Sequence, residues 1–107
     1  MLSFKPAPSI SRTKPKPQTQ TNRFPYYKVF LHDYRGHLTD KTERRYVVGC
    51  ILKTFEDMEK KEAIRKVYMA YKMGVSLLRI YPQDRAEESC ETLRRNAIHS
   101  TIEPMDF

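Results

Sequence analysis

The spacing of apolar residues along residues 26–103 limits the possible folds more than any other feature of this chain. In residues 26–32 (YYKVFLH), Tyr27, Val29 and Leu31 share one side and Lys28 lies on the other, a period of two that predicts a β-strand. Residues 75–81 (VSLLRIY) predict a second strand and residues 99–103 (HSTIE) a short third one. Between them the apolar period lengthens to that of a helix. The pattern therefore indicates a mixed fold.

Three helices are predicted between these strands. The first follows Asp40, which fits a capping box with Glu43, and runs to about Phe55. The second covers about Lys60–Met73 and ends before Gly74, because glycine adopts a left-handed cap at little cost. The third covers about residues 83–97, with Pro82 at its start. The residues expected to face the core are Val47, Val48, Ile51, Leu52 and Phe55 in the first helix, Ala63, Val67, Ala70 and Tyr71 in the second, and Ala86, Cys90, Leu93 and Ala97 in the third.

The predicted elements follow one another in the order β-α-α-β-α-β. Residues 33–40 (DYRGHLTD) are predicted to form a loop, because they hold a glycine and mostly polar side chains. One small sheet of three strands, with three helices covering one of its faces, is an α+β two-layer sandwich.

Residues 1–25 differ in composition from the rest of the chain. They hold five of the seven prolines. They also hold five of the 20 basic residues and none of the 13 acidic residues. Residues 26–107 therefore carry 15 basic and 13 acidic residues and are nearly balanced. Because proline removes backbone donors and polar residues have nothing to bury, we expect a disordered basic extension before one domain over residues 26–107. Its role stays open between a solvated tail, an organelle transit peptide and a handle for another protein.

The residue patterns of most enzyme and metal sites are missing. Three glycines leave no phosphate-cradling loop, and neither a nucleophile elbow nor HExxH occurs. His32, Asp33 and His37 cluster too loosely to specify a set of metal ligands. Cys50 and Cys90 fall on the expected core sides of helices, where packing explains them better than catalysis. We therefore expect no enzyme activity, no metal and no cofactor.

A small basic RNA- or ribosome-associated module is the alternative class. The chain has a net charge of +7 and seven tyrosines, and an open sheet face would present Tyr26, Lys28 and Phe30. Arg79 and Tyr81 on the second strand would add little to such a surface. Because most of the charge excess lies ahead of the domain, we expect no nucleic acid partner for the domain itself.

Five segments carry a resemblance to a known family: residues 24–29 (FPYYKV), 46–55 (YVVGCILKTF), 69–74 (MAYKMG), 84–93 (DRAEESCETL) and 100–104 (STIEP). In this order, and with the β-α-α-β-α-β pattern, they resemble ClpS, the small adaptor of the Clp AAA+ protease. The cyanobacterial and plastid forms are the most similar. The resemblance spans the whole predicted domain.

The resemblance implies an adaptor that carries out no chemistry itself. Its implied partners are the N-domain of a ClpA- or ClpC-type unfoldase, which the N-terminal extension helps to engage, and substrate proteins or peptides held by their N-terminal residue (an N-degron). An α-ammonium needs anionic or carbonyl acceptors, and the side chain beside it needs a small apolar pocket. We expect a monomer without a membrane partner, in the cytoplasm, or in the plastid stroma if residues 1–25 are a transit peptide.

The implied substrate site departs from the family pattern. The family's acidic motif is reduced to HDYR at residues 32–35, so Asp33 alone keeps a carboxylate and Arg35 opposes it. Tyr71 stands where the family has a histidine, and residues 34–45 hold an insertion beside the pocket. The alternative interpretation is structural, with a capping acid and packed helix residues. The residues expected to hold the substrate N-terminus are Asp33, Tyr34, Val67, Ala70 and Tyr71.

The implied unfoldase contact lies at the start of the third predicted helix. Asp84 matches an acidic position of the family, and Glu87 matches the acid of its Ala-Glu pair, whereas Ser89 replaces a basic residue. The alternative interpretation is that both acids favour the positive end of the helix dipole.

Overall fold

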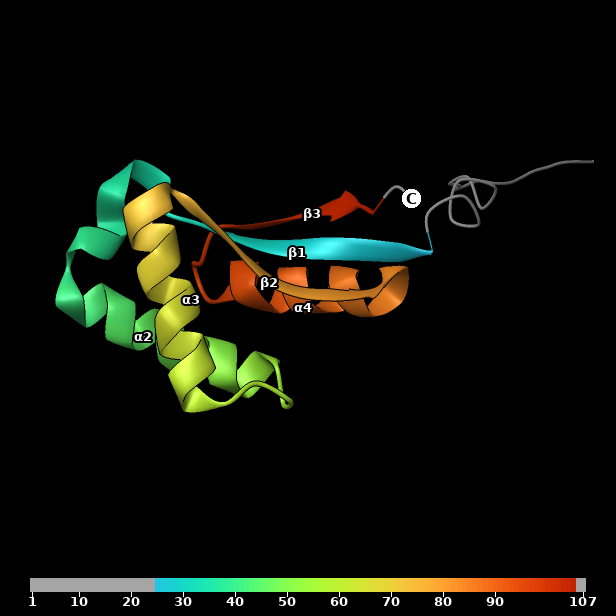
Figure 1. Cartoon of the computed structure of the whole chain (residues 1–107), viewed down its shortest axis with the longest axis horizontal. Coiled ribbons are helices and arrows are strands. Elements are labelled where there is room, and N and C mark those ends of the chain that lie inside the picture. The colour runs from blue at the N-terminus through green and yellow to red at the C-terminus, as the bar shows by residue number, and fades with distance from the viewer. Residues whose placement is uncertain (1–24, 106–107) are drawn as a thin grey trace, which may run out of the picture.

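The computed structural model describes residues 25–105, so the expected disordered extension lies outside it apart from Pro25. The predicted order of strands and helices is confirmed (Figure 1). One short 3-10 helix, η1, is added after the first strand. The elements are β1 (Tyr26–His32), η1 (Tyr34–Thr39), α2 (Lys41–Thr54), α3 (Lys60–Met73), β2 (Val75–Pro82), α4 (Gln83–Arg95) and β3 (Ser100–Pro104).

The three strands form one antiparallel sheet with β1 in the centre, in the order β2-β1-β3. Val29 on β1 lies opposite Arg79 on β2 and Ile102 on β3. Helix α4 runs along the sheet and contacts all three strands, while α2 and α3 pack together at the end where β1 stops (Figure 1). This arrangement is the expected α+β architecture.

One hydrophobic core joins the sheet to all three helices. Val29 and Leu31 bring the inner side of β1 into it, which confirms the alternation expected for this strand. Among residues 25–105, none of the helices is long and apolar enough to cross a membrane. The largest fully buried side chains are Phe55, Leu31, Leu38, Ile51, Leu78, Leu93 and Ile98.

The segment before α2 is more ordered than the predicted loop. It forms η1, which is kinked where Arg35 (φ 56°) and Gly36 (φ 72°) adopt left-handed conformations. Asp40 caps α2 as predicted, since its carboxylate accepts a hydrogen bond from the Thr42 backbone N–H at 2.8 Å. The backbone N–H of Asp40 donates to the His37 carbonyl at 3.3 Å, so this donor is satisfied within η1. The second half of the predicted capping box, in which Glu43 accepts a hydrogen bond from this N–H, is therefore wrong.

The end of α4 corrects another prediction. The helix stops at Arg95, and Ala97 is exposed with φ 63° rather than packed in the core. The Ile98 N–H donates to the Leu93 carbonyl, and the Ala97 N–H donates to the Arg94 carbonyl, both at 3.0 Å, which is the Schellman pattern of helix ends. Ile98 is buried in place of Ala97. The left-handed cap at Gly74, with φ 89°, is confirmed.

Candidate functional site

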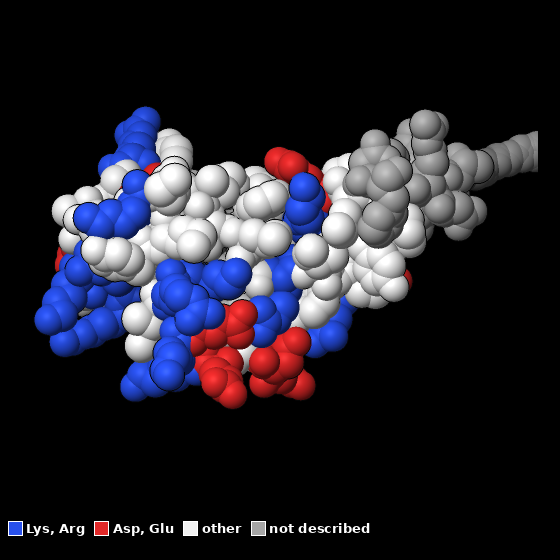
Figure 2. Space-filling view, viewed as in Figure 1, with Lys and Arg blue, Asp and Glu red and all other residues white. Residues whose placement is uncertain are grey.

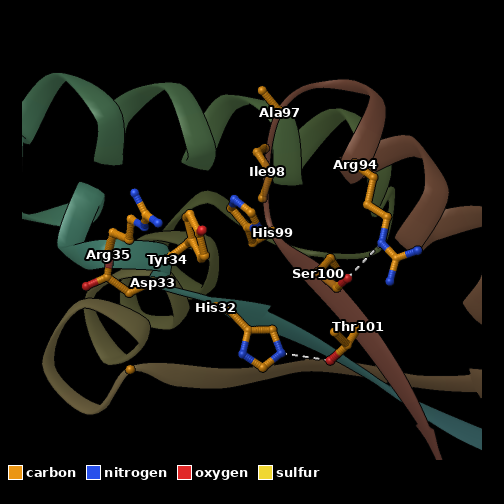
Figure 3. A pocket seen from close by; sticks show the side chains of 11 residues that line it. His32, Asp33, Tyr34, Arg35, Arg94, Ala97, Ile98, His99, Ser100 and Thr101 are labelled. Carbon is orange, nitrogen blue, oxygen red and sulfur yellow. Dashed lines mark hydrogen bonds between the residues drawn. The ribbon is translucent and has the colours of Figure 1, made fainter.

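An open hollow of about 710 Å3 lies at the end of β1, and we call it the β1 hollow (Figure 3). Its walls are residues 32–35, Gly74, Arg94 and residues 97–101, which come from four separate parts of the chain. The backbone N–H of His32 donates to the His99 carbonyl, and that of Asp33 donates to the Gly74 carbonyl, both at 3.0 Å. Sheet pairing and the end of α3 therefore hold the hollow in shape.

Aromatic rings form one wall of the β1 hollow. The rings of Tyr34 and His99 stack with centroids 4.1 Å apart, and the Arg35 guanidinium lies 5.2 Å from the Tyr34 centroid. On the opposite side, His32 Nε2 and Thr101 Oγ1 are hydrogen-bonded at 2.7 Å (Figure 3). Such a wall offers a flat apolar surface to a ligand side chain.

The charges of the β1 hollow are mostly positive. Among the described residues that line it, Asp33 is the one acid, whereas Arg35 and Arg94 are both cationic. The Nε–H of Arg94 donates to the Ser100 carbonyl at 3.0 Å, which keeps this guanidinium beside the hollow (Figure 3). A ligand ammonium group is therefore attracted by one carboxylate and opposed by two guanidiniums.

The Asp33 carboxylate already accepts a hydrogen bond from within the protein. Its Oδ1 accepts a hydrogen bond from the Leu38 backbone N–H at 2.9 Å, and within residues 25–105 no hydrogen bond is formed to Oδ2. The Leu38 carbonyl accepts a hydrogen bond from Arg44 Nη1 at 2.7 Å, and the Leu38 side chain is fully buried. Sequence reasoning missed Leu38, although it is the one aliphatic residue in the polar segment 33–40.

The site residues expected on α3 lie away from the β1 hollow. Val67 contributes to a second hollow of about 620 Å3 between α2 and α3, which we call the α2–α3 groove. Ala70 is fully buried in the core, together with Leu38. Tyr71 is half-buried, with the Arg44 guanidinium 4.9 Å from its ring centroid. The structure thus brings Asp33 and Tyr34 together, whereas Val67, Ala70 and Tyr71 do not line the β1 hollow.

The two acids expected to contact an unfoldase lie exposed on α4. Glu87 accepts a hydrogen bond from Gln83 Nε2 at 3.1 Å within the first turns. Glu88 and Glu91 are exposed on the same helix and were missed. Asp84, Glu87, Glu88 and Glu91 stand at i, i+3, i+4 and i+7, so all four carboxylates lie on one face of the helix. We call this face the α4 acidic face.

The second strand does not extend an RNA-binding surface. Arg79 donates two hydrogen bonds to the Glu62 carboxylate, at 2.7 and 3.0 Å, and lies 3.4 Å from Asp57. The hydrogen bond from Arg79 lowers the pKa of Glu62 and in turn raises the pKa of Arg79. Tyr81 is buried in the core, and this burial raises its pKa. Both side chains are therefore occupied within the fold.

Neither the cysteines nor the histidines of residues 25–105 form a metal site. Cys50 is half-buried against the core, and Cys90 is buried with its Sγ 3.3 Å from the Ser100 carbonyl oxygen. Among residues 25–105, no three His, Cys, Asp or Glu side chains are arranged to hold a metal ion. The loose cluster of His32, Asp33 and His37 therefore does not form a ligand set in the described part of the chain.

Comparison with known proteins gives a family and a fold. The model of the family "ATP-dependent Clp protease adaptor protein ClpS" matches residues 22–107. The chloroplastic Clp protease adapter CLPS1 of Chlamydomonas reinhardtii is 37% identical over 99 residues, which cover 92% of this chain and 54% of that protein. This chain thus spans about half of that relative's length. ClpS of Gloeobacter violaceus is 30% identical over 88% of this chain and 96% of its own. Agrobacterium tumefaciens ClpS2 bound to L-phenylalaninamide has a similar structure, with a TM-score of 0.64 and 25% identity, over 78% of this chain and all of the other.

Proposed function

Because this chain belongs to the ClpS family of Clp protease adaptors, we propose that it binds a ClpA- or ClpC-type AAA+ unfoldase and delivers or selects substrates for it. In this proposal the chain acts as a monomer, and the protease performs all of the chemistry. The relatives from chloroplasts and cyanobacteria support a location in the plastid stroma or in the cytoplasm. The extension of residues 1–25 would help to engage the unfoldase.

The observation that supports the proposal most is the α4 acidic face. Its four carboxylates are exposed, although residues 25–105 as a whole are slightly basic. Glu91 is paired with Arg95 at 3.4 Å, and no ion pair within residues 25–105 involves the other three carboxylates. A cluster of carboxylates on a mixed surface steers association with a partner of the opposite sign. Asp84 and Glu87 therefore remain our candidates for the unfoldase contact, now together with Glu88 and Glu91.

Calorimetric titration with the N-domain of a ClpC-type unfoldase tests this contact. We expect a micromolar or lower Kd for the full chain, and a loss of roughly tenfold or more for the double variant D84K/E87K, because like charges then meet at the interface. The control E43K/E103K makes the same change of charge at exposed sites away from α4, and its Kd should stay within about twofold. An equal loss in both variants would mean that overall charge, and not this face, determines binding.

We assign the substrate N-terminus to Asp33, with Tyr34 beside it. The oxygen Oδ2 can accept a hydrogen bond from an α-ammonium, and the stacked rings of Tyr34 and His99 offer an apolar wall. The ligand named for the similar ClpS2 structure, L-phenylalaninamide, has a free amine next to an aromatic side chain. This ligand class supports the assignment.

Leu38 occupies the interior beside Asp33 in the way that a substrate residue would. Its backbone N–H donates to the Asp33 carboxylate, and its side chain is buried in the same core as Val67 and Ala70. In this proposal, a substrate side chain that enters beside Asp33 and reaches those two residues, with Tyr71 packed against the same core, displaces Leu38. In this proposal the inserted segment is an internal competitor for the substrate site.

Fluorescence anisotropy with labelled peptides that begin with phenylalanine tests the substrate site. We expect binding to require the free amine, so that N-acetylation or D33A abolishes it. The matched acid-to-alanine variant D84A, on the α4 acidic face, should bind these peptides as the unchanged protein does. Equal binding of the acetylated peptide would contradict the assignment of Asp33.

A further inference from the structure

The α2–α3 groove is an apolar surface that the fold leaves uncovered. Helix α2 contributes residues at positions 45, 48, 49 and 52, and α3 contributes positions 60, 64, 67 and 68, which is the spacing of one helix face in each case. Ile64 is 49% exposed and Tyr68 is 51% exposed. The apolar floor of the groove consists of Val48, Gly49, Leu52, Ile64, Val67 and Tyr68.

Gly49 lies in the middle of α2, where the fold itself does not require glycine. A Cβ atom built at this position meets no other atom within 4 Å, and the backbone is not in a left-handed conformation. Glycine in the interior of a helix is less stable than alanine. A missing side chain over open space instead allows another backbone to approach closely. Gly49 therefore leaves the floor of the groove open to the close approach of another backbone.

The rim of the groove is strongly basic. Four cationic residues line it, and among its described lining residues none is acidic. Figure 2 shows Lys and Arg side chains gathered over the end of the molecule that holds α2 and α3. Residues 1–25 carry five positive charges and no negative one, so charge repulsion argues against this segment as the occupant. The cationic residues of the rim are Lys41, Arg44, Arg45 and Lys60.

From these observations we propose that the α2–α3 groove binds an acidic amphipathic helix of a partner protein. The apolar side of that helix lies across Gly49 and between Leu52 and Tyr68, and its carboxylates pair with the basic rim. This contact goes beyond the adaptor function proposed above. It uses none of the α4 acidic face and shares only Val67 with the proposed substrate site.

The substitution G49A separates this role from folding. The probe is a fluorescein-labelled peptide of about 18 residues, long enough to form a helix, with leucines at i, i+3, i+4 and i+7 and glutamates elsewhere. We expect G49A to raise the melting temperature of the full chain by roughly 2–8 °C and to weaken peptide binding by roughly tenfold. A more stable variant with unchanged affinity for the peptide would overturn the proposal.

Charge reversal on the rim tests the choice of an acidic partner. The triple variant K41E/R45E/K60E should lose the glutamate peptide by roughly tenfold or more, while the equally charged control K53E/K61E/R65E, at exposed sites outside the groove, should keep it. A lysine version of the peptide should not bind. Equal losses in both triple variants would overturn the proposal. A dimer in analytical ultracentrifugation that G49L converts to monomer would also overturn it, because the occupant would then be a second copy of this chain. Competition between anionic phospholipid vesicles and the peptide would overturn it as well, because the occupant would then be a membrane.

Discussion

Replacing Leu38 by alanine tests whether this side chain takes the place of a substrate residue. Leu38 is fully buried, and its backbone is tied to Asp33 and Arg44 by hydrogen bonds of 2.9 and 2.7 Å. Truncating a buried leucine removes its transfer free energy and leaves a cavity, so we expect L38A to lower the free energy of unfolding by about 2–5 kcal/mol. Urea unfolding measures this loss.

The same substitution should strengthen peptide binding. In the unchanged protein, opening the site exposes the Leu38 side chain, which costs about 1.5–3 kcal/mol, or a factor of roughly 10–150 in Kd. Alanine removes most of this cost and leaves a cavity that a phenylalanine side chain can fill. A peptide beginning with phenylalanine should therefore bind L38A roughly tenfold or more tightly than the unchanged protein, as fluorescence anisotropy would measure.

The control is L93A, which truncates another fully buried leucine, on α4. It should destabilise the protein by a similar amount without changing the Kd of the peptide. The reasoning is refuted if L38A and L93A affect peptide binding alike, because a general loosening of the core would then explain the effect. An unchanged Kd in L38A would equally refute it.

Three further predictions concern stability. E62Q should lower the free energy of unfolding at pH 7, because it removes the carboxylate bound to Arg79. Since this hydrogen bond lowers the pKa of Glu62 from its ordinary value of 4.5, the contribution is present above that value and is lost as the pH falls through the folded-state pKa. The urea midpoints of the two proteins should therefore differ at pH 7 and approach each other as the pH is lowered below 4.5. G74A should lower the free energy of unfolding by about 1–2 kcal/mol, because φ is 89° at this position, a left-handed conformation that alanine disfavours. A Cβ atom would meet nothing within 4 Å, so steric contact would not contribute. A change below about 0.3 kcal/mol in urea unfolding would contradict this account. D40A should cost about 1 kcal/mol through the lost cap of α2, while D40N, which can still accept the Thr42 N–H, should stay close to the unchanged protein in thermal unfolding.

Local patterns were sufficient for most of the elements. The bounds of β1 and α3 agree with the prediction, since alternation, helical spacing and the cap at Gly74 are all local signals. The end of α4 was placed two residues too far, because Ala97 fits the helical period of the core positions. Burial of Ile98, together with the Schellman hydrogen bonds, stabilises the left-handed Ala97 instead. That competition depends on the core and cannot be judged from residues 83–97 alone.

The candidate site was predictable only in part. The motif resemblance pointed to Asp33, and the structure places Asp33 and Tyr34 in one hollow. The resemblance could not reveal the stacking of Tyr34 on His99 or the hydrogen bond from the Leu38 N–H to Asp33. The first joins residues far apart in the chain, and the second depends on a kinked turn that a polar loop pattern does not predict.

The sequence by itself determined the family, the order of strands and helices and the side of each element that faces the core, because apolar periodicity and capping act over a few residues. The tertiary structure alone decided which side chains share a hollow and which charges stay available. Pairing of β3 with β1 brings His99 to Tyr34, and the packing of α2 on α3 leaves Gly49 over open space. These outcomes follow from contacts between distant segments, whose geometry is set only when the whole core is packed.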